Sequence, residues 1–216
     1  MKIKIILLNS ILGIFISIFL LITAVQYFSF NEDYILKNID KNVPVPSDDL
    51  QVISEKLADY LENKEDSLAF EITFAGETRA AFNSREIQHM VDVKEIYIKL
   101  NYLKLISLLI IISIIALNRK KYLLSAMYYS AGLSFGISIL LALVFTINFN
   151  KAFIFFHEIA FSNDLWLLDP RTDLLINLLP LSFFTNISIH ILILFIAFES
   201  LGIFIIYKTK KVLTSP

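Results

Sequence analysis

The chain has 216 residues, of which 56% are hydrophobic, 19 are phenylalanine and none is cysteine. Soluble domains have roughly 45–50% apolar residues, and the mean hydropathy here is +0.68, so the composition indicates a membrane protein. The lack of cysteine excludes disulfides, thiolate nucleophiles and cysteine-based metal sites. A net charge of −1 gives no basic surface for nucleic acid.

Four segments are long and apolar enough to cross a bilayer, which takes about 20 residues. They are 5–26, 98–117, 122–147 and 187–207. The first follows two lysines, as a signal peptide does, but its apolar stretch exceeds the roughly 7–15 residues of a signal core. We therefore expect an uncleaved first span in an α-helical membrane protein with four transmembrane helices.

The basic residues predict how the chain is oriented, because they gather on the cytoplasmic side of short connections. Eight of them, without acidic partners, lie near the N-terminus, at 119–121 and near the C-terminus. The opposite side holds 31–99, with a net charge of −7, and 148–185, with −2. We expect cytoplasmic termini and both long segments outside.

This pattern divides the chain into five parts. They are 1–30 with the first span, an extracellular cap at 31–99, the second and third spans at 100–147, an extracellular or interfacial segment at 148–185, and the fourth span and C-terminus at 186–216.

The cap has mixed helix and strand signals. Ser47 is placed to cap a helix from Asp48 to about Asn63. Alternating apolar residues predict a half-buried strand at 68–74, and Asn83 with Glu86 predicts another helix start. We therefore expect a small α/β cap.

Three histidines are candidates for chemistry, because their unperturbed pKa lies near neutrality. His89 stands three residues from Glu86 and from Asp92, so both carboxylates can lie near it on a helix face; the alternative is a solvated, charged helix. His157 follows a run of phenylalanines, where an interfacial histidine is the alternative. His190 is better explained by a contact between helices.

Two further polar features have simpler readings. Glu199 is the one acid well inside a predicted span; such residues are functional candidates by default, but its place in the cytoplasmic half favours a structural polar contact. His157-Glu158 begins like a metalloprotease helix, which needs a second histidine four residues on, where Phe161 stands. We expect no metal and no other cofactor.

The segment from His157 to Phe184 is unusually rich in polar groups for a stretch beside lipid. Asp169-Pro170 predicts the start of a short helix that lies flat and ends before Leu179-Pro180. An interfacial linker is the alternative, but the concentration of a tryptophan, an asparagine, acids and a histidine favours a site.

Two motifs make the chain recognisable. They are His157-Glu-x-x-Phe-x-Asn-x-x-Trp-x-Leu-Asp-Pro-x-x-Asp with its continuation to Phe183-Phe184, and His89-Met-x-Asp-Val before the second span. Together they resemble the bacterial lipoprotein intramolecular transacylase family, over essentially the whole chain.

The resemblance implies an enzyme of the bacterial cell membrane whose catalytic histidines are His89 and His157. It implies a lipoprotein substrate whose N-terminal cysteine carries a diacylglyceryl group. The sn-2 acyl chain would move to the α-amino group, giving a lyso-form lipoprotein by acid–base catalysis, without a covalent acyl-enzyme. We expect contacts to this substrate and to membrane lipids from Asp92, Phe155, Phe156, Phe161, Asn163, Trp166, Asp169, Phe183 and Phe184.

Two other functions stay open at this point. One is a non-enzymatic sensor or assembly factor that binds peptide or lipid through its cap, for which the histidines would be replaceable. The other is a metal-dependent membrane hydrolase, which chelators would inhibit.

Overall fold

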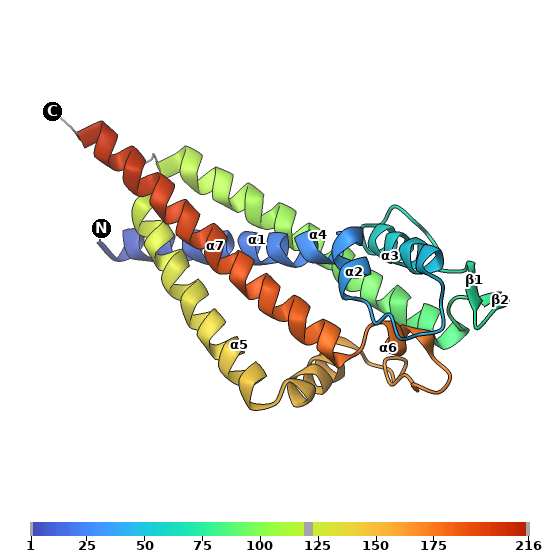
Figure 1. The fold of residues 1–216 in the computed structure, drawn as a ribbon. Coiled ribbons are helices and arrows are strands. Elements are labelled where there is room, and N and C mark those ends of the chain that lie inside the picture. The colour runs from blue at the N-terminus through green and yellow to red at the C-terminus, as the bar shows by residue number, and fades with distance from the viewer. Residues whose placement is uncertain (1, 119–122, 215–216) are drawn as a thin grey trace. The chain divides into compact units, whose positions relative to one another are not determined.

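The computed structural model describes residues 2–118 and 123–214 and divides into two compact units (Figure 1). We call 1–25, 100–146 and 189–216 the membrane unit, and 26–99 with 147–188 the cap unit. Tyr122, the predicted start of the third span, and the basic residues at 119–121 lie outside the described residues.

Four helices of the described chain are long and apolar enough to cross a membrane, which confirms the predicted class. They are α1 (Lys2–Ser29), α4 (Ser84–Asn118), α5 (Leu123–Ala160) and α7 (Leu181–Thr214). The helices α1, α4 and α7 are longer than the spans predicted from their apolar residues, because the helix continues beyond the apolar stretch at one or both ends.

The cap unit has its own apolar core. It contains α2 (Glu32–Asn38), α3 (Ser47–Leu61), the antiparallel strands β1 (Glu71–Phe74) and β2 (Glu77–Ala80), and α6 (Leu174–Leu178). Core side chains from these elements include Ile35, Ile53, Leu57, Ile72 and Leu178. The predicted α/β character of the cap is therefore confirmed.

Three local predictions for the cap need correction. Ser47 does not cap α3: it is the first helical residue, and Pro46 holds the cap position. The predicted strand 68–74 is regular only over Glu71–Phe74, and β2 was not predicted. Ala75 and Gly76 join the two strands with φ values of 53° and 89°, as a type I′ hairpin requires.

The short helix after the third span also differs from its prediction. Asp169 to Thr172 form a turn, and α6 begins only at Leu174. Its residues Leu174, Leu175 and Leu178 are buried in the cap core, so α6 is a core element of the cap unit and not a helix lying flat in the membrane interface.

Helix α5 is interrupted at Asn148, whose φ of −167° and ψ of 91° are not helical. The Asn148 side chain accepts a hydrogen bond from the Lys151 N–H at 3.0 Å, as an N-cap residue does. The part of α5 from 149 to 160 is therefore a separate, capped helix, and it carries His157.

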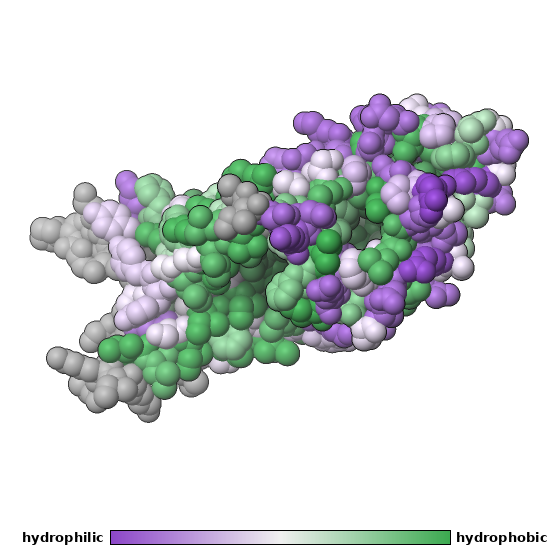
Figure 2. All heavy atoms as spheres, turned by 90° about the horizontal axis from the view of Figure 1, so that it is seen from below, coloured by the Kyte–Doolittle hydropathy of each residue, from purple (hydrophilic) through white to green (hydrophobic). Residues whose placement is uncertain are grey.

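The membrane unit has an apolar surface, as Figure 2 shows for one face. Its exposed side chains include Leu105, Ile112, Leu140, Leu143, Ile193 and Leu201. Inside this unit the carboxylate of Glu199 is fully buried and accepts hydrogen bonds from Ser130 and Ser134 at 2.8 and 2.6 Å. These bonds join α5 to α7, so the predicted structural contact of Glu199 is confirmed.

At Gly13 the backbones of α1 and α5 are in close contact. A Cβ atom at this position would lie 2.9 Å from the backbone N of Ser130 and 3.2 Å from the backbone O of Ala126. Backbone atoms cannot turn aside as a side chain can, so the contact requires glycine. Gly136 has no atom within 4 Å of such a Cβ.

We expect Gly13→Ala to lower the free energy of unfolding by about 1–3 kcal/mol, because overpacked cores relax poorly. Gly136→Ala is the matched control and should leave stability unchanged or raise it slightly, since alanine is the better helix former. Thermal unfolding in detergent micelles measures both. Equal stabilities of the two variants would contradict the close packing of α1 on α5.

Candidate active site

In the cap unit His89 lies on the second turn of α4, whose first turn is held by side-chain hydrogen bonds. The Asn83 side chain accepts hydrogen bonds from the N–H groups of Arg85 and Glu86 at 2.9 and 3.1 Å. Glu86 in turn accepts from the Asn83 N–H at 2.7 Å. This reciprocal arrangement is a capping box, and it confirms the helix start predicted from Asn83 and Glu86.

The Glu86 carboxylate accepts hydrogen bonds from backbone N–H groups and not from His89. Its second carboxylate oxygen accepts from the Leu175 N–H at 2.6 Å, and its side chain is 1% exposed. The same carboxylate therefore joins the start of α4 to α6. The other acid expected beside His89, Asp92, lies on the same helix and accepts a hydrogen bond from the Asn163 side chain at 2.9 Å.

His157 has a defined tautomer. Its Nδ1 lies 2.7 Å from the backbone carbonyl oxygen of Phe153. A carbonyl only accepts, so the ring proton is on Nδ1 and the lone pair of the neutral ring is on Nε2. Burial lowers the pKa of His157 below its usual 6.5, although the Phe153 carbonyl opposes this. A neutral imidazole with a free Nε2 lone pair is suited to act as a base.

The structure brings the two predicted histidines together. Their ring centroids are 6.1 Å apart, and each side chain is 7% exposed. Phe161 contacts both rings, at 5.2 Å from His89 and 5.5 Å from His157, and Trp166 lies 5.0 Å from His157. Nδ1 of His89 is buried without a hydrogen-bond partner among the described residues.

Aromatic side chains continue from this pair. Phe156 contacts His157 edge-on at 5.3 Å, and Phe183 contacts Phe184 at 5.4 Å. Phe155 differs: its side chain is 62% exposed, and no ring contact among the described residues joins it to either histidine.

Phe153 is the site residue that the sequence reasoning missed. Its ring is 4.2 Å from His157 and 5.0 Å from Phe184, and its carbonyl fixes the His157 tautomer. The signal was available, because a residue four positions before a helical histidine offers its carbonyl on the same face.

The carboxylate of Asp169 is paired with Arg171. Arg171 donates to both of its carboxylate oxygens, from Nε at 3.0 Å and from Nη2 at 2.6 Å. These bonds hold the pKa of the Asp169 carboxyl at about 2. Its backbone N–H donates to the carboxylate of Asp173 at 2.7 Å, so Asp169 helps to form the turn before α6.

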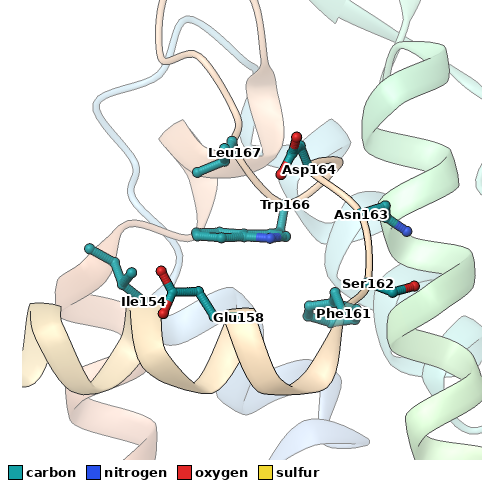
Figure 3. A pocket seen from close by; sticks show the side chains of 8 residues that line it. All are labelled: Ile154, Glu158, Phe161, Ser162, Asn163, Asp164, Trp166 and Leu167. Atoms are coloured by element: carbon teal, nitrogen blue, oxygen red, sulfur yellow. The ribbon is translucent and has the colours of Figure 1, made fainter.

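A pocket of about 590 Å³ lies in the same unit (Figure 3). It shares Phe161 and Trp166 with the surroundings of the histidines, and Glu158, Asn163 and Asp164 supply polar groups to its wall. Among the described residues no group of three or more histidines and acids is arranged to hold a metal ion.

Four apolar helices and a cap that buries two neighbouring imidazoles define an integral membrane protein with a polar candidate active site. The family model of the lipoprotein intramolecular transacylase Lit matches residues 4–184, and the chain belongs to this family. It is thus a membrane acyltransferase that acts on lipoproteins.

Solved structures of Lit from Bacillus cereus have the same fold. One is 24% identical, covers 98% of this chain and 100% of its own, and has a TM-score of 0.82. Two variants, with one histidine replaced by arginine or alanine, are 23% and 24% identical with TM-scores of 0.76. They cover 99% of this chain and 96% and 97% of their own. No curated protein matches the sequence.

We expect Glu86→Ala to lower the free energy of unfolding by about 3 kcal/mol, because two backbone N–H groups would lose their acceptor, each at about 1–3 kcal/mol. Glu95→Ala on the same helix is the matched control: its carboxylate is exposed and, among the described residues, pairs only with Lys99, so its loss should cost under about 1 kcal/mol. Chemical unfolding in micelles measures both variants. A Glu86→Ala protein as stable as the control would refute the role of Glu86 at the helix start.

Proposed function

We propose that the chain moves the sn-2 acyl chain of a diacylglyceryl lipoprotein to the α-amino group of its N-terminal cysteine. The amine attacks the ester carbonyl through a ring of eight atoms: N, Cα, Cβ, S, two glyceryl carbons, the ester oxygen and the carbonyl carbon. An intramolecular attack needs no nucleophile from the enzyme. A chain without cysteine and with two buried imidazoles is suited to this reaction.

In this mechanism His157 is the base. As the amine nitrogen forms its bond to the carbonyl carbon, Nε2 of His157 takes the proton that the nitrogen releases. The observation that carries the assignment is the 2.7 Å bond from Nδ1–H to the Phe153 carbonyl, which leaves Nε2 unprotonated. Such a positioned base typically contributes 10²–10⁴-fold to the rate.

When the carbon–oxygen ester bond breaks, the imidazolium of His157 returns its proton to the departing glyceryl oxygen, which restores the neutral base. Burial and the neighbouring His157 lower the pKa of His89 to about 4, so His89 acts as a neutral imidazole whose N–H donates a hydrogen bond to the ester carbonyl oxygen as negative charge develops there. The buried Nδ1 of His89 has no partner among the described residues, which supports a group that is reserved for a substrate. The aromatic side chains around the pair would hold the substrate in the ring conformation.

A serine-based acyl-enzyme is the mechanistic alternative. Gly132-Leu133-Ser134-Phe135-Gly136 has the letters of a nucleophile elbow, but an elbow needs a sharp turn from strand to helix. These residues lie inside α5, and the Ser134 hydroxyl donates to Glu199 at 2.6 Å. This context favours a packing role for Ser134.

We also propose that the site faces the outside of the bacterial membrane. The predicted extracellular parts, 31–99 and 148–185, carry all the residues assigned to the site. The clusters of lysine and arginine in the termini and at 119–121 support cytoplasmic placement of the opposite side. Membrane lipids would surround the exposed Phe155.

We expect His89→Ala and His157→Ala each to lower transacylation by at least about 100-fold. The measurement is fragmentation mass spectrometry of an N-terminal lipopeptide after incubation with purified protein. The parent protein should yield an N-acyl cysteine at unchanged total mass, with or without a chelator. Loss of one acyl chain would indicate a hydrolase, inhibition by chelator a metal enzyme, and an unchanged lipopeptide with folded parent protein a binding protein.

The His157 ring should titrate below its usual value of 6.5, because burial penalises the charged imidazolium and so lowers the pKa. The neutral base is then present at pH 7 and is lost only in more acidic solution. NMR of protein with labelled histidine measures the midpoint, and His157→Gln identifies the signal by its disappearance. A midpoint at or above 6.5 would contradict the buried, neutral base.

A further inference from the structure

Glu158 faces the pocket beside the histidines. Ile154, His157, Glu158 and Phe161 are spaced as i, i+3, i+4 and i+7, so they form one stripe along the last helical segment of α5. Figure 3 shows the Glu158 side chain next to the indole of Trp166, within the pocket of about 590 Å³. Trp166 therefore contacts both the pocket and the His157 ring, which lies 5.0 Å from it.

The carboxylate of Glu158 is exposed and receives no hydrogen bond or ion pair from any described residue. Asp92 and Asp169 have donors of their own. Asn163 donates to Asp92 at 2.9 Å, and Arg171 holds Asp169 in an ion pair at 2.6 Å. Neither carboxylate is as available to a ligand as Glu158 is.

Asp173 and Glu86 are also occupied. Asp173 accepts from the Asn83 amide at 2.8 Å and from the Asp169 N–H at 2.7 Å, and Glu86 accepts from two backbone N–H groups. Arg85 donates to the backbone carbonyl of Asp164, which brings a guanidinium to that end of the pocket. Asp164 also lines the pocket, and its carboxylate receives no hydrogen bond from a described residue, but its end of the pocket holds the Arg85 guanidinium. Glu158 is the pocket carboxylate that lies on the helical stripe of His157 and has no described cation beside it.

The substrate of the proposed reaction has one charge that its product lacks. An α-amino group has a pKa of about 7.7–8.0 and is largely an ammonium ion at and below neutral pH. After acyl transfer the same nitrogen is a neutral amide. A carboxylate and the face of an indole are two protein groups that bind an ammonium ion well.

We infer that Glu158 and Trp166 form a subsite for the α-ammonium group of the lipoprotein substrate. This inference rests on the proposed function. The subsite binds the amino terminus as a cation next to the base on the same helical stripe, and the neutral amide of the product loses that interaction. Glu158 thereby favours substrate over product, which a site built only of aromatic walls does not do.

The test compares two diacylglyceryl-cysteine lipopeptides, one with a free amino terminus and one N-acetylated. Binding is measured near pH 6.5 in lipid nanodiscs with the full chain carrying His157→Gln, so that the free amine is not consumed. We expect this protein to bind the free amine roughly 5–30-fold more tightly than the acetylated form. Adding Glu158→Gln should reduce the preference to about 1, with affinity for the acetylated form retained.

Two controls make the result specific. Glu77→Gln removes the same charge from β2, outside the pocket, and should keep the full preference; Glu158→Asp should keep part of it. A preference that survives Glu158→Gln overturns the subsite, and so does an equal loss of affinity for both lipopeptides, which indicates a packing role. Transacylation that persists in His89→Ala and His157→Ala would instead overturn the proposed mechanism. It would not change the measured preference for the free amine over the acetylated lipopeptide.

Discussion

The buried carboxylate of Glu86 is the interaction on which the cap unit depends. One oxygen closes the first turn of α4 through the Asn83 N–H, and the other accepts from Leu175 at the start of α6. Two segments some 90 residues apart in the chain are thereby fixed to one acid. His89 follows one helical turn later, so its position is set by the same bonds.

The second constraint is the break in α5. Because Asn148 ends one helix and caps the next, the stripe with His157 and Glu158 belongs to the cap unit and not to the apolar span before it. A short helix with its own cap gives His157 a backbone acceptor four residues back. The imidazole is therefore oriented by its own helix and buried by the aromatic side chains of the loop that follows.

Few acidic side chains are buried in either unit, and each buried acid accepts hydrogen bonds from identified donors. Glu199 joins helices in the membrane unit through serine hydroxyls, whereas Glu86 holds backbone N–H groups in the cap unit. An acid buried without such donors would carry a large desolvation cost. Because Glu158 is exposed, its carboxylate has no such desolvation cost, and its charge is available to a ligand.

The sequence alone determined the four spans and the helix start at Asn83 and Glu86, and it pointed to the two histidines that we propose as catalytic, since apolar length, capping patterns and family motifs are local signals. Only the tertiary structure decided that Glu86 turns to Leu175, that α6 is a core element, that Asp169 is held by Arg171 and that Phe153 orients His157. Each of these depends on which donor comes within about 3 Å of an acceptor. Residues far apart in the chain meet only after folding, so spacing along the sequence cannot specify them.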